Sequence, residues 1–79
     1  MNDENGKLGT SDFYFAAYCL AQGFKIEEIN RDNPRRMIFV FGDIKHGDQL
    51  AEDFLYGRTS VEPKRFAQAI RELKQLLYS

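Results

Sequence analysis

The residues best suited to chemistry are Asp43, His46 and Asp48, which lie within six positions of one another. A carboxylate beside an imidazole can act as a general acid or base, and the three side chains could also ligate a metal ion. The chain has only 1 His and 1 Cys, so no second imidazole supports either role. Helix capping accounts better for the pattern, with Asp43 or Asp48 accepting free backbone N–H groups. We therefore expect no enzyme activity, no metal and no other cofactor.

The single cysteine, Cys19, lies in the uncharged stretch from Phe13 to Ala21. In an apolar helix a thiol packs as a small hydrophobic side chain. A lone cysteine cannot form an internal disulfide, and it fits a reducing compartment. The polar, acidic first residues lack a signal-peptide pattern, and no apolar run is long enough to span a membrane. These features predict a cytoplasmic protein without a membrane partner.

Three arginines, Arg31, Arg35 and Arg36, surround the turn-forming residues Asn33 and Pro34. A protruding basic hairpin can enter a nucleic-acid groove or bind phosphates with paired hydrogen bonds. The alternative is a solvated turn whose arginines form ion pairs with nearby acids, namely Asp32, Glu27 and Glu28. The chain has 11 Lys and Arg residues against 12 Asp and Glu residues, which argues against a dedicated nucleic-acid-binding protein.

The helix predicted for residues 12–22 has two different faces. One face should pack on a sheet, and it consists of Phe13, Ala16, Ala17, Leu20 and Ala21. The opposite face carries Tyr14, Tyr18 and Gln22, with Phe15 beside them. Tyrosine is favoured where a surface meets a partner. We therefore expect Tyr14, Phe15, Tyr18 and Gln22 to bind a second copy or another protein, unless the helix at 63–77 covers this face.

The remaining pattern predicts an α+β domain over residues 7–79, after a disordered leader at 1–6. Thr10 or Ser11 should cap the first helix, and Gly23 should end it. Residues 24–30 and 36–41 read as a β-hairpin with a bulge near Glu27 and Glu28. Both faces of the second strand are apolar, so it should be central and covered on both sides, or covered by helices on one side and by a partner on the other.

Two further helices are expected after the hairpin, at residues 47–56 and 63–77. The first should bury Leu50, Ala51, Phe54 and Leu55. The second begins at Pro63, which suits the first helical position, and its apolar stripe is Phe66, Ile70, Leu73 and Leu77. Residues 7–10 could add an edge strand. The three helices should pack on the small antiparallel sheet that the hairpin forms.

Residues 9–78 carry three recognisable patterns, T-S-D-F-Y-F-A-A-Y-C-L-A-Q-G-F, I-N-R-D-N-P-R-R-M-I-F-V-F and V-E-P-K-R-F-A-Q-A-I-R-E-L-K-Q-L-L-Y. Together they resemble a family of very small bacterial and bacteriophage domains of unknown function. The resemblance implies a prokaryotic or phage origin, and it supplies no activity and no site residue.

A chain of 79 residues has a small core that gives limited stability. Its single Cys and single His argue against disulfides and a metal, so association with a partner is the remaining way to add stability. We expect a non-enzymatic module that acts through protein–protein contacts, including a homodimer. The alternative is a nucleic-acid-binding accessory protein that uses the basic hairpin tip.

Overall fold

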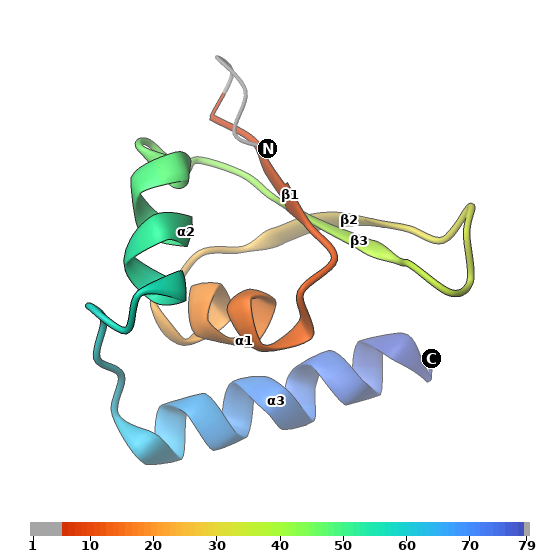
Figure 1. Cartoon of the computed structure of the whole chain (residues 1–79). Coiled ribbons are helices and arrows are strands. Elements are labelled where there is room, and N and C mark those ends of the chain that lie inside the picture. Colours follow the sequence, from red (N-terminus) through yellow and green to blue (C-terminus); the bar gives the residue numbers. More distant parts are fainter. Residues whose placement is uncertain (1–5, 79) are drawn as a thin grey trace.

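The computed structural model describes residues 6–78. Its elements, in chain order, are β1 (Leu8–Thr10), α1 (Phe13–Ala21), β2 (Ile26–Asn30), β3 (Ile38–Phe41), α2 (Gly47–Leu55) and α3 (Pro63–Leu77) (Figure 1). The α+β class, the hairpin, the edge strand and all three helices are confirmed. Of the predicted leader at 1–6, residues 1–5 lie outside the described range. The carbonyl of Gly6 accepts a hydrogen bond from the N–H of Ile44 at 2.9 Å.

The three strands form an antiparallel sheet in the order β1-β3-β2. Leu8 lies opposite Phe41 and Thr10 opposite Phe39, so the side chains of these residues share one face and are buried there. The register between β2 and β3 shifts between Ile26 and Glu28, which confirms the expected bulge. The shift returns Ile29 to the same face as Ile26, because one extra residue reverses the alternation of the side chains.

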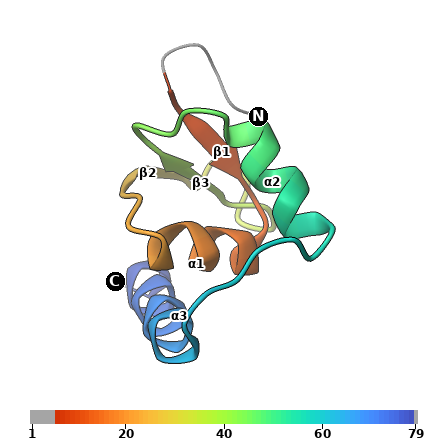
Figure 2. The same cartoon turned by 90° about the vertical axis from the view of Figure 1, so that its left-hand side faces the viewer.

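Helix α1 lies between the sheet and α3, so the fold has three layers (Figures 1 and 2). On the sheet side, the rings of Phe13 and Phe39 meet edge to face with their centres 6.5 Å apart. On the far side, Leu20 and Ala21 face α3, since they line a small hollow together with Ala69. The prediction that Leu20 and Ala21 pack on the sheet was therefore wrong. A helix that is enclosed from two sides needs apolar residues all round, which explains the uncharged sequence of α1.

The helix caps differ in part from those expected. Asp12, and not Thr10 or Ser11, caps α1, because its carboxylate accepts from the N–H groups of Tyr14 at 3.0 Å and Phe15 at 3.1 Å. Thr10 instead holds the cap residue, since its hydroxyl accepts from the N–H of Asp12 at 3.1 Å. Gly23 follows α1 with a φ of +98°, the left-handed conformation that favours glycine.

Helix α3 begins as predicted, with Pro63 in its first turn. The carboxylate of Glu62 caps it by accepting from the N–H of Arg65 at 2.9 Å. Its apolar stripe faces the core, where Ala69 and Leu73 are buried and Phe66, Ile70 and Leu77 are half-buried. The assignment of the buried face of α3 is confirmed.

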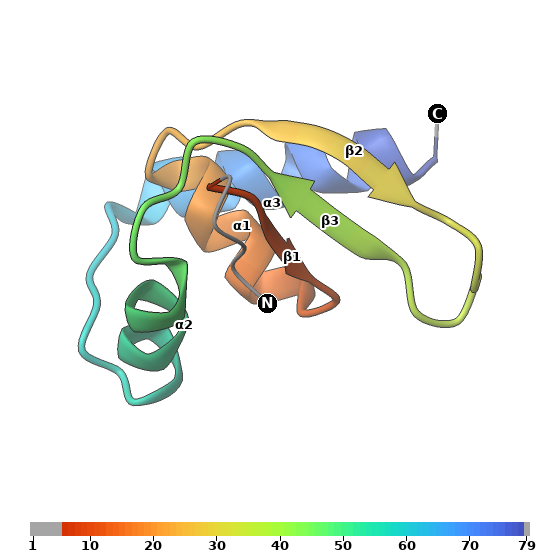
Figure 3. The same cartoon turned by 90° about the horizontal axis from the view of Figure 1, so that it is seen from above.

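The sheet carries helices on one face only within residues 6–78, as the view from above shows (Figure 3). The central strand β3 directs Phe39 and Phe41 to the covered face, while Ile38 and Val40 are half-buried on the other. None of the helices in the described part of the chain is both long enough and apolar enough to cross a membrane.

Candidate functional site

The structure separates the four residues that we expected to form one partner face on α1. Phe15 and Tyr18 are only 3% and 6% exposed, whereas Tyr14 is 61% exposed and Gln22 is also exposed. The prediction was therefore wrong for Phe15 and Tyr18, which belong to the core. Tyr14 and Gln22 remain accessible to a partner.

Helix α2 and the connection after it cover Phe15 and Tyr18. The ring of Phe54 lies 5.3 Å from that of Phe15 and 5.4 Å from that of Tyr18, measured between ring centres. Tyr18 also makes a side-chain hydrogen bond with Thr59, although burial dominates and raises the pKa of the tyrosine above its usual value. The alternative to a partner face was cover by the helix at 63–77, but these contacts come from α2 and its connection to α3.

Helix α2 leaves two large apolar residues outside. Leu55 is 75% exposed and Tyr56 is 66% exposed, so Leu55 does not belong to the buried stripe that the sequence predicted for it. Both lie at a hollow of about 570 Å³ between α1, β1 and α2, which we call the α1–α2 hollow. Its lining consists of Thr10, Asp12, Phe15, Ala51, Glu52, Phe54, Leu55 and Tyr56.

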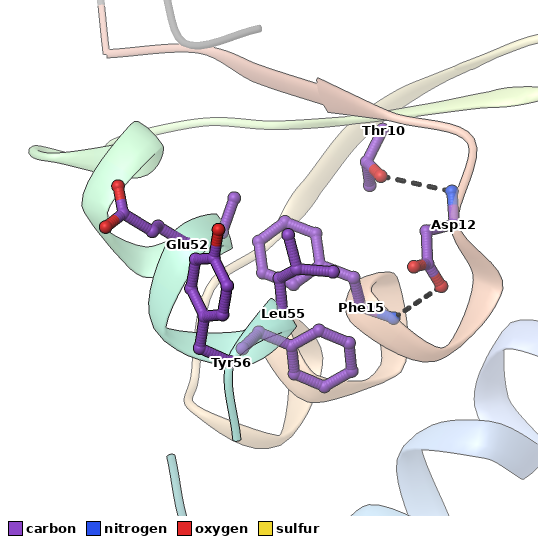
Figure 4. A pocket seen from close by; sticks show the side chains of 8 residues that line it. Thr10, Asp12, Phe15, Glu52, Leu55 and Tyr56 are labelled. Atoms are coloured by element: carbon purple, nitrogen blue, oxygen red, sulfur yellow. Dashed lines mark hydrogen bonds between the residues drawn. The ribbon is translucent and has the colours of Figure 1, made fainter. Parts of the chain in front are cut away.

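Figure 4 shows how these side chains lie. Phe15 forms the back of the α1–α2 hollow, and Leu55 and Tyr56 come from the end of α2 in front of it. The carboxylates of Glu52 and Asp12 lie on opposite sides of this apolar centre. The hollow therefore combines an apolar interior with an acidic rim.

Arg58 holds the end of α2 in place. Its guanidinium donates to the carboxylates of Asp53 at 3.1 Å and Glu52 at 3.2 Å, and it lies 5.2 Å from the centre of the Tyr56 ring. Contacts of this kind fix a ring that is otherwise open to solvent. Arg58 partly neutralises Glu52 and Asp53, and the carboxylate of Asp12 accepts from the first N–H groups of α1, so the rim keeps only part of its formal negative charge.

The hairpin tip does not present its three arginines together. Arg31 turns toward α3, where its guanidinium donates to the carbonyls of Leu76 at 2.8 Å and Leu77 at 3.4 Å. A cation at a helix C-terminus satisfies carbonyls that have no partner within the helix. Arg36 donates to the hydroxyl of Ser11 at 3.4 Å, and Arg35 is exposed. The tip is therefore attached to the end of α3 through Arg31.

Among the described residues, none of these arginines forms an ion pair with Asp32, Glu27 or Glu28, so the alternative in which the tip arginines pair with these acids was wrong. Glu27 instead pairs with Lys7 at 3.7 Å. The turn is held by asparagines, since the side-chain oxygens of Asn30 and Asn33 accept from the N–H groups of Asp32 and Arg35.

A second hollow, of about 420 Å³, lies between the hairpin tip and the C-terminal end of α3, and we call it the tip hollow. Arg35 and Arg36 give it a basic rim, while its apolar lining comes from three elements. The complete lining is Ser11, Phe13, Pro34, Arg35, Arg36, Met37, Phe39 and Leu77.

Asp43, His46 and Asp48 form no capping group. His46 occupies the N-cap position of α2 without a side-chain capping bond, so neither aspartate serves as the cap that we expected. Asp43 and His46 both have left-handed backbones, with φ values of 56° and 58°. No group of three or more His, Cys, Asp or Glu residues in the range 6–78 could hold a metal ion.

The thiol of Cys19 is enclosed in the core, and burial raises its pKa to about 12. A thiol with so high a pKa is protonated at neutral pH and is a poor nucleophile. Cys19 therefore acts as a core side chain and not as a reactive group.

Sequence reasoning missed the α1–α2 hollow because Leu55 fits the apolar stripe of α2 by spacing. The available signal was the pair Leu55-Tyr56 directly before Gly57, where the helix ends. A nine-residue helix makes few turns, so apolar side chains at its end can lie beyond the part of the core on which the helix packs.

Comparison with known proteins places the chain in a family without assigning it an activity. Neither the curated proteins nor the solved structures contain a match. One family model matches residues 5–79, and its description is "Domain of unknown function (DUF5659)". The match includes every residue that lines the two hollows. The chain therefore belongs to the DUF5659 family of domains of unknown function.

Proposed function

We propose that this protein is a non-enzymatic interaction module that binds a protein partner at the α1–α2 hollow. The observation that carries this proposal is the exposure of Leu55 and Tyr56 beside the buried ring of Phe15. Apolar residues that line a hollow and face solvent are typical of surfaces that bind another protein. An apolar side chain of a partner would enter the hollow and contact all three residues.

The rim indicates the chemistry of that partner. Asp12 and Glu52 place carboxylates on two sides of the apolar centre, so a basic residue next to the inserted side chain would be attracted. Burying a leucine- or phenylalanine-sized side chain is worth about 1.5–3 kcal/mol. The charged rim would add orientation and speed of association more than affinity.

The hollow is already formed without a partner. Phe15, Tyr18 and Phe54 pack against one another, and Arg58 fixes Tyr56. A partner would therefore lose little free energy in ordering the site.

Nuclear magnetic resonance titration of the labelled protein would test the proposal with three short peptides. The first has a phenylalanine flanked by arginines, the second replaces the phenylalanine by alanine, and the third replaces the arginines by glutamates. We expect the first peptide alone to shift the amide signals of Phe15, Ala51 and Leu55. Absence of any shift at millimolar peptide, in protein that sedimentation shows to be monomeric at the concentration used, would overturn the proposal.

Tyr56→Glu should abolish the shifts, and Tyr78→Glu provides a matched control. Both tyrosines are exposed C-cap residues, of α2 and α3 respectively, but only Tyr56 lines the hollow. Equal loss of binding in both variants would show that the peptide binds by general charge attraction.

A second candidate function is binding of nucleic acid at the hairpin tip, in a protein of bacterial, phage or mobile-element origin. The exposure of Arg35 and Arg36 supports this candidate. The engagement of Arg31 with α3 weakens it, because one of the three expected phosphate contacts is already used. Binding of protein is the better supported of the two.

A further inference from the structure

The two hollows flank the same short turn, which joins β1 to α1. Thr10 and Asp12 line the α1–α2 hollow, while Ser11 and Phe13 line the tip hollow. Successive residues of the turn therefore face alternate sides of it. Tyr14, which is exposed, follows directly after this turn.

The two hollows are alike in lining and opposite in charge. The α1–α2 hollow has the carboxylates of Asp12 and Glu52 at its rim. The tip hollow has the guanidinium groups of Arg35 and Arg36. Each also presents apolar side chains: Leu55 and Tyr56 in the first, and Pro34, Met37 and Leu77 in the second. A surface with both hollows therefore carries two apolar sites whose rims have opposite charge.

We propose that the partner is a second copy of this chain, related by a two-fold axis that passes beside the turn from Thr10 to Phe13. A rotation by 180° about this axis exchanges the two sides of the turn. The tip hollow of each copy then meets the α1–α2 hollow of the other, so both contacts form at once, as an isologous interface requires. This proposal rests on the proposed function of the α1–α2 hollow and names its occupant.

In this dimer, Met37 and Pro34 of one copy enter the apolar centre beside Leu55 and Tyr56 of the other. Arg35 and Arg36 meet the rim that contains Asp12 and Glu52. Tyr14 lies next to the axis, where two aromatic rings from the two copies come together. Arg31 stays outside the contact because it is bonded to the end of α3.

A charge-exchange experiment tests the arrangement. Variant A carries Arg35→Glu and Arg36→Glu, so both of its hollows are acidic. Variant B carries Glu52→Arg, so its tip hollow stays basic and its α1–α2 hollow becomes less acidic. Analytical ultracentrifugation over a concentration series should show that A dissociates roughly 100-fold more readily than the native protein, because like charges now face each other.

Mixing A with B should restore the dimer. The basic tip of B meets the acidic rim of A, which is attractive, and the acidic tip of A meets the rim of B, which Glu52→Arg makes less acidic and therefore less repulsive. Recovery of dimer in the mixture, but in neither variant alone, is the expected result. Arg71→Glu, on the exposed face of α3 and in neither hollow, is the control and should leave the dimer unchanged.

A native protein that stays monomeric at millimolar concentration would overturn the dimer, as would a mixture that fails to recover it. The proposed function of the hollow is tested separately, because variant A leaves the lining of the α1–α2 hollow intact and unoccupied. If variant A binds the arginine-flanked phenylalanine peptide, the hollow is an interaction site whose natural partner is not a second copy. If it does not bind, both proposals fail.

Discussion

Helices α1 and α2 have the same length, nine residues each, and opposite surroundings. In α1 six residues are buried, whereas in α2 only Gly47 is buried. The sheet and α3 enclose α1 from two sides, while α2 packs beside these layers through a few apolar side chains (Figure 2). The comparison teaches that α1 holds the fold together, and that α2 is available to present side chains to a partner.

A single aromatic cluster connects the two helices. Phe54 of α2 contacts Phe15 and Tyr18 of α1, so the cluster has one member on the exposed helix and two on the buried one. Elements with few buried contacts are common at binding sites. The difference between the helices can be tested by substitution.

The largest difference should appear between Phe15 and Leu55, which line the same hollow. Phe15→Ala should lower the free energy of unfolding by about 3–5 kcal/mol, because it leaves a cavity in the core. Leu55→Ala should change it by no more than roughly 0.5 kcal/mol, since most of this side chain is already in water. Urea unfolding followed by circular dichroism measures both values, and a large effect of Leu55→Ala would remove the distinction between the helices.

The enclosure of α1 by α3 predicts the next effect. Leu73 is fully buried in the face of α3 that packs on the core, so Leu73→Ala should cost about 2–4 kcal/mol. Arg71→Ala, two residues earlier on the exposed face, should lie within about 0.5 kcal/mol of the native protein. If both variants lose the same stability in chemical denaturation, α3 does not cover α1 in the way described.

The burial of Cys19 away from water predicts that the stability of the fold depends on pH. The pKa of Cys19 is raised to about 12 in the folded chain, so the unfolded chain loses the thiol proton at a lower pH. The protonated thiol of Cys19 therefore makes its full contribution to the free energy of unfolding below about pH 9, and this contribution decreases as the pH rises toward 12. Between these limits the free energy of unfolding should fall by a slope that approaches 1.4 kcal/mol per pH unit.

Cys19→Ala removes this slope and is the reference for it. The quantity to measure is the difference in unfolding free energy between the native protein and Cys19→Ala at pH 8, 9 and 10, because other groups titrate in both proteins. A difference that does not change with pH would mean that the thiol reaches water in the folded state.

The smallest effect is expected at the hairpin tip, and it separates the two candidate functions. We expect little affinity for random duplex or single-stranded nucleic acid even at low salt, and changing Arg35 and Arg36 to glutamine should leave that affinity unchanged. If the tip binds phosphates, affinity should instead fall steeply with salt, and the double change should reduce the slope of log affinity against log salt by about two. Fluorescence anisotropy at several salt concentrations distinguishes the outcomes.

Most of the fold could be predicted from local patterns. The α+β class, the edge strand, the bulge and α3 follow from periodicity, proline and glycine, which act within a few residues. The cap of α1 was missed because Thr10, Ser11 and Asp12 all have capping side chains, and only the direction of the chain after β1 selects Asp12.

The candidate site could not be predicted, because it depends on which helix covers which side of α1. The uncharged face with Tyr14 and Tyr18 fits a partner surface or an internal contact equally well. Tyr18 is internal because Phe54 packs on it and residues 56–62 pass across α1, where Thr59 meets Tyr18 and the carbonyl of Ser60 accepts from Gln22 at 3.3 Å. Long-range packing of this kind leaves no local pattern in the sequence.

The position of α3 also bears on how the protein is made. Helix α3 leaves the ribosome after every element on which it packs. It also follows Arg31, whose guanidinium donates to the carbonyl of Leu76, 45 residues later in the chain. Until then the side of α1 with Leu20 and Ala21 has no cover from α3 and offers an uncharged surface to chaperones. A nascent chain stalled before Pro63 should therefore be held by chaperones, and release of α3 should free it.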